Sequence, residues 1–120
     1  VPWASGETIT YKDGSRYVGD VSNGIQHGFG TQIWPSGVWY FGEYWDGQQH
    51  GLGTFRFGDG GGSYVGWLKH GKFHGIGIFA LGNREYAGEW KDGVRWSGAG
   101  YLPSGEVKGT YLDGVFKHAN

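Results

Sequence analysis

The stretch Tyr40–Gly53 reads YFGEYWDGQQHGLG and holds the pattern that decides the fold of this chain. Written generally, the pattern is Y-x-G-x-apolar-x-x-G-x-x-H-G-x-G. Further copies begin at Tyr17, Tyr64, Tyr86 and Val107. The copy at Tyr86 is degraded, because it ends in Gly98 and Gly100 without the histidine, and the last copy is cut short. The first glycines of successive copies lie 21 to 24 residues apart, and self-similarity at such a period predicts a repeat architecture.

This pattern resembles the MORN repeat (membrane occupation and recognition nexus). The three copies that keep both Y-x-G and H-G-x-G make the resemblance specific, because several residue identities recur at fixed offsets. The resemblance covers nearly the whole chain, since residues 7–16 read as the second half of a preceding repeat. We therefore expect one MORN-repeat domain over residues 1–120, with repeats at about 17–39, 40–63, 64–85 and 86–106 and partial repeats at 7–16 and 107–120.

Composition and charge narrow the classes of protein to which the chain can belong. A length of 120 residues predicts one domain. The 27 glycines are periodic and interleaved with aromatic residues, whereas disordered segments are poor in aromatics, so we expect a folded chain. The net charge is −1 and the Lys and Arg residues are scattered, so the sequence lacks the basic footprint of a nucleic-acid or anionic-membrane partner. The lack of cysteine excludes disulfides and thiol catalysis.

No apolar stretch approaches the ~20 residues of a membrane helix. Because the chain begins at Val1 rather than methionine, we expect a processed or excised piece of a longer protein.

Each copy reads as one β-hairpin. In the central copy we expect a first strand from Tyr40, a turn at Trp45–Gln48 and a second strand over Gly53–Phe57. Asp-Gly pairs suit such turns, because glycine adopts positive φ without a Cβ clash. Glycine inside a helix costs about 1 kcal/mol per site relative to Ala, so a helix is disfavoured. We therefore predict an all-β fold, namely an elongated, curved, single-layer antiparallel sheet of stacked hairpins, one per ~23-residue repeat.

Alternation along the first strands separates two faces. One face carries a repeated apolar–Gly–apolar triplet, in which the glycine leaves room for neighbouring rings and allows strong curvature. The chain has no sequence for a second layer, so this face must be covered by curvature, by ring-on-glycine packing, by a second chain or by a partner. We expect a concave, aromatic groove. Its candidate partner-binding residues are Tyr17, Tyr40, Tyr44, Phe55, Phe57, Tyr64, Tyr86 and Trp90.

The opposite face carries extra aromatic residues in the middle repeats, where polar residues are expected. Exposed apolar patches often mark interaction sites, and Trp is over-represented at binding hot spots. The alternative is that these rings only cover the outside of the sheet or pack on Arg56. The candidate partner-binding residues of this outer patch are Trp39, Phe41, Trp45, Val65 and Trp67.

Histidines His27, His50 and His74 recur once per repeat and raise the question of a metal site. Equivalent residues of neighbouring hairpins lie two strands apart, roughly 9–10 Å, whereas zinc ligands lie ~2.0–2.1 Å from the metal. We therefore predict no metal site and interpret each imidazole as a group that hydrogen-bonds near the turn and packs against glycine. The pair His70 and His74 has the spacing of a helical zinc motif but spans a glycine turn, so it is discounted.

No set of residues predicts catalysis. Glu43 and Glu89 lie two repeats apart, beyond the about 5–9.5 Å that paired catalytic carboxylates need. Asp20 and Glu43 lie one repeat apart on a face that should be solvated, where a charged pair is the expected outcome. The Gly-x-Gly segments lack the lysine and the following helix of a phosphate loop. We predict no catalytic residue, no cofactor and no enzyme activity.

As a family, MORN-like arrays serve as scaffolds and protein-binding ribbons. The resemblance thus implies a non-catalytic scaffold that binds a protein or peptide partner or self-associates as a homodimer through its aromatic surfaces. It also implies a cytoplasmic location, at membrane-associated or cytoskeletal structures. A membrane- or phosphoinositide-targeting module is one alternative, which the net charge of −1 disfavours. An accessory domain of a larger enzyme is the other, because MORN-like segments occur attached to lipid kinases and to a lysine methyltransferase.

Overall fold

The structure, a computed structural model, describes residues 3–119 and the side chains of residues 6–119. Val1, Pro2 and Asn120, at the ends of the expected domain, lie outside the described residues. In chain order, the strands are β1 (Trp3–Thr10), β2 (Arg16–Ser22), β3 (Ile25–Ile33), β4 (Trp39–Trp45), β5 (Gln48–Arg56), β6 (Ser63–Lys69), β7 (Lys72–Leu81), β8 (Arg84–Lys91), β9 (Val94–Tyr101), β10 (Val107–Leu112) and β11 (Val115–His118).

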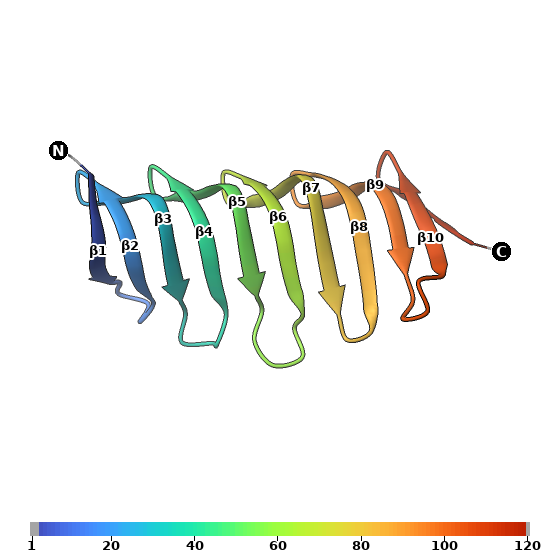
Figure 1. Cartoon of the computed structure of the whole chain (residues 1–120), viewed down its shortest axis with the longest axis horizontal. Coiled ribbons are helices and arrows are strands. Elements are labelled where there is room, and N and C mark those ends of the chain that lie inside the picture. Colours follow the sequence, from blue (N-terminus) through green and yellow to red (C-terminus); the bar gives the residue numbers. More distant parts are fainter. Residues whose placement is uncertain (1–2, 120) are drawn as a thin grey trace.

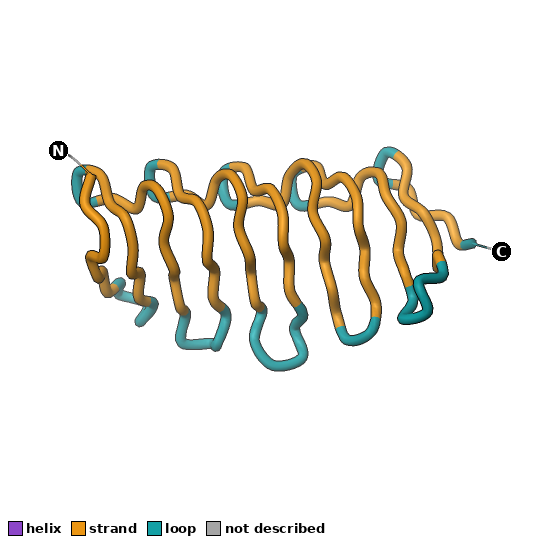
Figure 2. The backbone as a smooth tube through the Cα atoms, viewed as in Figure 1, coloured by secondary structure: helices purple, strands orange, loops and turns teal. Residues whose placement is uncertain are grey.

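These strands form one open antiparallel sheet whose spatial order follows chain order from β1 to β11. Each strand pairs only with its neighbours in sequence, so the sheet is a row of hairpins without a crossover (Figure 1). The molecule measures 55 × 27 × 21 Å, and its backbone forms a single layer (Figure 2). The predicted all-β, single-layer sheet of stacked hairpins is confirmed. Residues 3–119 contain no helix of the length and apolarity that crossing a membrane requires.

Tight turns connect the two strands of each hairpin, and they all lie at the same end of the strands. The residue pairs at their centres are Asn23–Gly24, Asp46–Gly47, His70–Gly71, Asp92–Gly93 and Asp113–Gly114. Both residues of each pair have positive φ, 45° and 82° for Asp46 and Gly47, as type I′ hairpin turns require. The Gly47 N–H also donates a hydrogen bond to the Gln26 carbonyl oxygen of the preceding hairpin, at 2.9 Å. Equivalent bonds run from Gly71, Gly93 and Gly114 to Gln49, Phe73 and Trp96. The turns therefore join neighbouring hairpins as well as the two strands of one hairpin.

The second strand of each hairpin begins earlier than the sequence predicts. In β5 it starts at Gln48, directly after the turn, where Trp45 pairs with Gln48. The H-G-x-G segment lies inside this strand as a bulge, because the β4–β5 register shifts between Gly42 and Tyr44. The predicted start at Gly53 is therefore wrong: the ladder continues through the motif. Bulges bend a strand, and the strands bend strongly at the end that carries the tight turns (Figure 2).

A lattice of tyrosine and glycine forms the core. Tyr40 is fully buried, and its hydroxyl donates a hydrogen bond to the Glu43 carbonyl oxygen at 2.9 Å. Its ring lies against the backbone of Gly53, where an added Cβ atom would meet the tyrosine hydroxyl oxygen at 2.2 Å. The same bond, from each tyrosine to the carbonyl three residues on, recurs at Tyr17, Tyr64 and Tyr86. The predicted ring-on-glycine packing is confirmed, and it covers the aromatic face without a second layer.

Candidate protein-binding surfaces

The inner face, defined as the face of the core tyrosines, carries all eight residues predicted to line a groove. Six of them are core residues with 0–5 % of their surface exposed, namely Tyr17, Tyr40, Tyr44, Tyr64, Tyr86 and Trp90. Their rings pack on one another and on Phe55, whose centroid lies 4.7 Å from that of Tyr40. This packing closes off the six residues and corrects the expectation that they line an accessible groove. Phe55 and Phe57 are half-buried, and a partner-binding role stays a prediction for these two.

Burial also raises the pKa values of the core tyrosines. It raises the pKa of Tyr17 to about 12, with a smaller contribution from the Asp20 carboxylate, and raises the pKa of Tyr64 to about 12. Burial raises the pKa of Tyr40 and of Tyr44 still further. Groups with pKa values so far above neutrality are not poised for proton transfer, so these phenols act as hydrogen-bonding parts of the core.

On the inner face, the residue that pairs with the core tyrosine differs from one hairpin to the next. Tyr17, Tyr40, Tyr64 and Tyr86 pair in turn with Gln32, Phe55, Phe79 and Gly100. In the first hairpin, Gln32 accepts buried hydrogen bonds from Gln26 at 2.7 Å and from the Tyr44 hydroxyl at 3.0 Å. Aromatic rings fill the position in the next two hairpins, and no side chain fills it in the fourth. Sequence reasoning missed this gradient, although aligning equivalent positions of the repeats could have found it.

The recurring histidines tie each hairpin to the next. The Nδ1 atom of His27 accepts a hydrogen bond from the backbone N–H of Asp46, in the following turn, at 3.3 Å. Equivalent bonds run from His70 to His50 and from Asp92 to His74. The interpretation of these histidines as hydrogen-bonding groups near the turn is confirmed. In the described part of the chain, no three His, Cys, Asp or Glu residues lie close enough together to hold a metal ion.

Asp20 and Glu43 bind the backbone of the bulges and do not form the charged pair expected from sequence. Asp20 accepts a hydrogen bond from the Phe29 N–H at 3.0 Å, and Glu43 accepts one from the Leu52 N–H at 2.6 Å. Both bonds stay within one hairpin, because a bulge leaves a backbone group without its ladder partner. The third hairpin has Trp67 in place of the carboxylate, which adds an aromatic ring to the outer face.

The outer face, opposite the core, carries the outer patch, and most of that patch is accessible. The exposed fractions are 52 % for Phe41, 58 % for Trp45, 53 % for Val65 and 47 % for Trp67. Trp39 is half-buried and pairs with Arg56 between β4 and β5. Four of the five side chains thus keep about half of their surface in solvent, and contiguous exposed apolar patches often mark interaction sites.

The exposed apolar area extends beyond the five predicted residues. Phe29, Leu52, Ile76 and Ile78 are also exposed on the outer face. Leu52 pairs with Trp67, and Val65 pairs with Ile78, so these side chains lie next to the outer patch. Phe29, Leu52 and Ile76 occupy the variable position of the H-G-x-G segments. Following the strand alternation through that motif would have found them.

Two hollows lie beside the outer patch, along the bulges. One has a volume of about 350 Å³ and includes Phe29 and Trp45, and the other has about 490 Å³ and includes Ile76. They share His50, Gly51 and Trp67, so they adjoin one another. In both hollows an exposed indole ring lies beside bare glycine backbone, an arrangement that can hold an apolar side chain of a partner.

Comparison with known families agrees with the repeat geometry. The family model "MORN repeat" matches residues 17–38, 40–62, 64–83 and 86–96, which together make up more than half of the chain. Each match starts at a core tyrosine of the lattice. A comparison with curated proteins finds no matching sequence. The tyrosine–glycine lattice, the row of hairpins and the family match together show that the chain belongs to the MORN repeat family.

Proposed function

We propose that this chain is a non-catalytic binding module and that the outer patch is its contact surface for another protein. MORN repeats generally form non-catalytic modules for binding or targeting. The observation that carries the proposal is the exposure of Phe41, Trp45, Val65 and Trp67 on a face that the fold does not need for its core. Rigid aromatic side chains supply a large contact area at low entropic cost, which suits protein recognition.

A second copy of this chain is the partner that the patch favours first. The outer face is a regular strand surface whose central part is apolar, and such a surface can pair with itself around a two-fold axis. Glu43 and Arg56, which carry opposite charges, lie on the same face of β4 and β5 and can meet across that axis. Another protein with an apolar, strand-like surface is the alternative occupant.

Light scattering on the purified chain and on Phe41→Ser/Trp67→Ser tests the proposal. The matched control is Leu112→Ser/Val115→Ser, because these two apolar residues are 70 % and 69 % exposed but lie in the last hairpin, away from the patch. The proposal expects a wild-type dimer, a monomeric patch variant and a dimeric control.

A monomeric wild type would exclude self-association as the function of the patch. The wild type, the patch variant and the control would then be compared in pull-downs. A partner captured by wild type and control but not by the patch variant would support a foreign protein as the occupant. Equal behaviour of the patch variant and the wild type in both assays would contradict the proposal, as would tight binding to neutral phosphatidylcholine vesicles without any protein association.

A further inference from the structure

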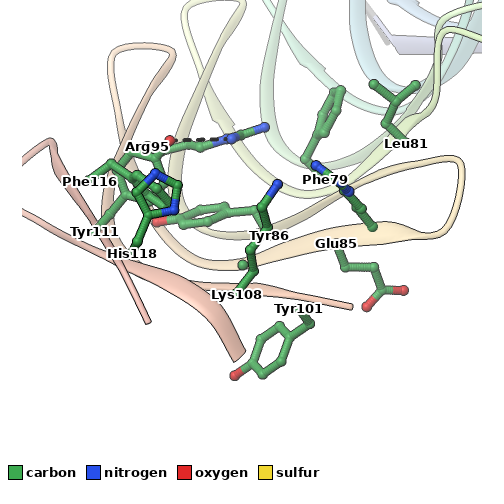
Figure 3. Close-up of a pocket in the computed structure, with 12 residues that line it drawn as sticks. Phe79, Leu81, Glu85, Tyr86, Arg95, Tyr101, Lys108, Tyr111, Phe116 and His118 are labelled. Carbon is green, nitrogen blue, oxygen red and sulfur yellow. Dashed lines mark hydrogen bonds between the residues drawn. The ribbon is translucent and has the colours of Figure 1, made fainter. Parts of the chain in front are cut away.

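The fourth hairpin has a cavity on the inner face, in the place where the preceding two hairpins have an aromatic ring. Gly100 pairs with Tyr86 there, whereas Phe55 and Phe79 pair with the preceding core tyrosines. A Cβ atom added to Gly100 would have no neighbour closer than 3.9 Å. No tyrosine ring packs on this glycine, so the space beside it is open. The resulting cavity has a volume of about 370 Å³ (Figure 3).

The walls of this cavity combine aromatic rings with cationic side chains. The rings belong to Phe79, Tyr86, Tyr101, Tyr111 and Phe116. The basic residues of the lining are Arg84, Arg95, Lys108 and His118. Among the described residues of the lining, Glu85 is the one that carries a carboxylate, and Figure 3 shows this carboxylate directed away from Arg95. The cavity therefore has an apolar surface and an excess of positive charge.

Arg95 is the residue that distinguishes this site from the other hairpins. It pairs with Trp90, at the position that holds Gln49 and Phe73 in the two preceding hairpins. The centre of its guanidinium lies 5.3 Å from the Tyr86 ring centroid and 5.8 Å from that of Tyr111. Cation–π contacts at such distances hold a guanidinium in place without using its N–H donors.

Those donors are largely available for a ligand. One N–H of Arg95 donates a hydrogen bond to the Tyr111 hydroxyl, at the long distance of 3.4 Å. Among the described residues, no carboxylate forms an ion pair with Arg95. A guanidinium offers five N–H donors in a planar fork that matches carboxylate and phosphate oxygens.

We infer that this cavity binds a small organic anion, whose carboxylate or phosphate contacts Arg95 and Lys108 and whose apolar or aromatic body packs on Tyr111 and Phe116. The volume fits, because small-molecule sites are typically about 300–1,000 Å³. The charge fits as well, since the lining carries three Lys and Arg residues and one Glu. The site lies on the inner face and is independent of the outer patch.

Nuclear magnetic resonance titrations of the whole chain with phenyl phosphate, benzoate, benzyl alcohol and inorganic phosphate test this inference. At least one of the two aromatic anions should cause saturable shifts at the amides of Gly100, Arg95 and Tyr111, and comparing the two anions tells phosphate from carboxylate. Benzyl alcohol and inorganic phosphate, which lack the charge and the ring respectively, should bind at least about tenfold more weakly.

Two variants take their side chains from equivalent positions of the second and third hairpins, where the sheet holds the same residue types. Arg95→Gln copies Gln49 and should weaken anion binding by about tenfold or more. Gly100→Phe copies Phe55 and Phe79 and should abolish binding by filling the cavity. Lys72→Gln, which removes an exposed cation outside the cavity, should bind like wild type, and unfolding curves establish that each variant is folded.

The inference is overturned if neither anion gives saturable shifts with wild type, or if both Arg95→Gln and Gly100→Phe bind as wild type does. Benzyl alcohol that binds as tightly as benzoate would overturn the role of the charge. Inorganic phosphate that binds as tightly as phenyl phosphate would overturn the role of the aromatic wall.

Discussion

Tyr40 explains why two glycines recur in every repeat. Its hydroxyl lies 2.6 Å from the place that a Cβ atom on Gly42 would take and 2.2 Å from the equivalent place on Gly53. A ring that packs on bare backbone excludes water from both strands, and any side chain at these positions would push it away. The Y-x-G and G-x-G parts of the repeat therefore depend on each other.

Gly53→Ala is expected to lower the free energy of unfolding by about 1–3 kcal/mol, the usual cost of overpacking. Gly100→Ala is the matched control, because it also faces a core tyrosine but its Cβ atom would have no neighbour closer than 3.9 Å. We expect it to stay within about 0.5 kcal/mol of wild type. Urea unfolding of the two variants measures the difference, and equal losses would contradict the tyrosine–glycine lattice.

The buried phenols predict a loss of stability in alkali. Tyr17 and Tyr64 have the ordinary pKa of 10.0 when the chain unfolds, but burial raises the pKa of each to about 12 in the folded state. Between these values the unfolded chain binds fewer protons than the folded chain, so the free energy of unfolding falls as the pH rises. Below pH 10 the contribution is fully present.

Urea unfolding at about pH 9 and about pH 11 measures this decline, and ultraviolet absorbance reports tyrosinate formation. Tyr17→Phe removes one of the ionising groups, so its stability should fall less steeply than that of wild type between the two pH values. A free energy of unfolding that does not change between them would show that the core tyrosines titrate alike in both states.

At the scale of the hairpin, the type I′ turn presents a backbone N–H to the histidine of the preceding hairpin. Asp46 has a φ of 45°, and in this left-handed conformation its N–H donates a hydrogen bond to His27 of the preceding hairpin. Because a side chain with a branched Cβ strains this region of φ by about 1–2 kcal/mol, the choice of turn residue affects the contact between hairpins too.

Asp46→Val should therefore lower the free energy of unfolding by about 1–2 kcal/mol. Asp46→Asn should remain close to wild type, because asparagine tolerates positive φ. Thermal unfolding compares the two, and the idea that the turn backbone matters would fail if the asparagine and valine variants were equally destabilised.

The hairpins could be predicted from the sequence because their determinants are local. The period, the Asp-Gly turns and the alternation of Tyr40, Gly42 and Tyr44 each depend on a few neighbouring residues. The extent of β5 could not be predicted in the same way, since its bulge is visible only when both strands are paired. The accessibility of the inner face also depends on the bend, so Tyr40 and Trp67 could not be told apart as core and surface by their residue types.

The cavity at Gly100 could not be predicted from the sequence, for a different reason. Its wall comes from Arg95, Lys108 and Phe116, which lie on three different strands. In the sequence each of them is only a departure from the repeat pattern. Their shared location follows from the register between strands, which the sequence pattern does not specify at the degraded end of the array.

At the scale of the whole molecule, the two faces of the single-layer sheet differ in burial. The inner face provides the buried core, from Tyr17 in β2 to Trp90 in β8. The outer face keeps large apolar side chains in solvent. Because the buried core side chains lie on the inner face, changes to exposed side chains of the outer face should leave the core in place. This separation makes a binding role for the outer patch compatible with stability.

The most direct test of this separation is urea unfolding of Tyr64→Ala and Trp67→Ala, two changes on the same strand β6. Tyr64 is fully buried, whereas Trp67 is 47 % exposed. We expect Tyr64→Ala to lose about 3–5 kcal/mol or to prevent folding, and Trp67→Ala to lose less than about 1 kcal/mol. Similar losses for the two variants would contradict the assignment of the core to the inner face and the claim that the outer face is not needed for stability.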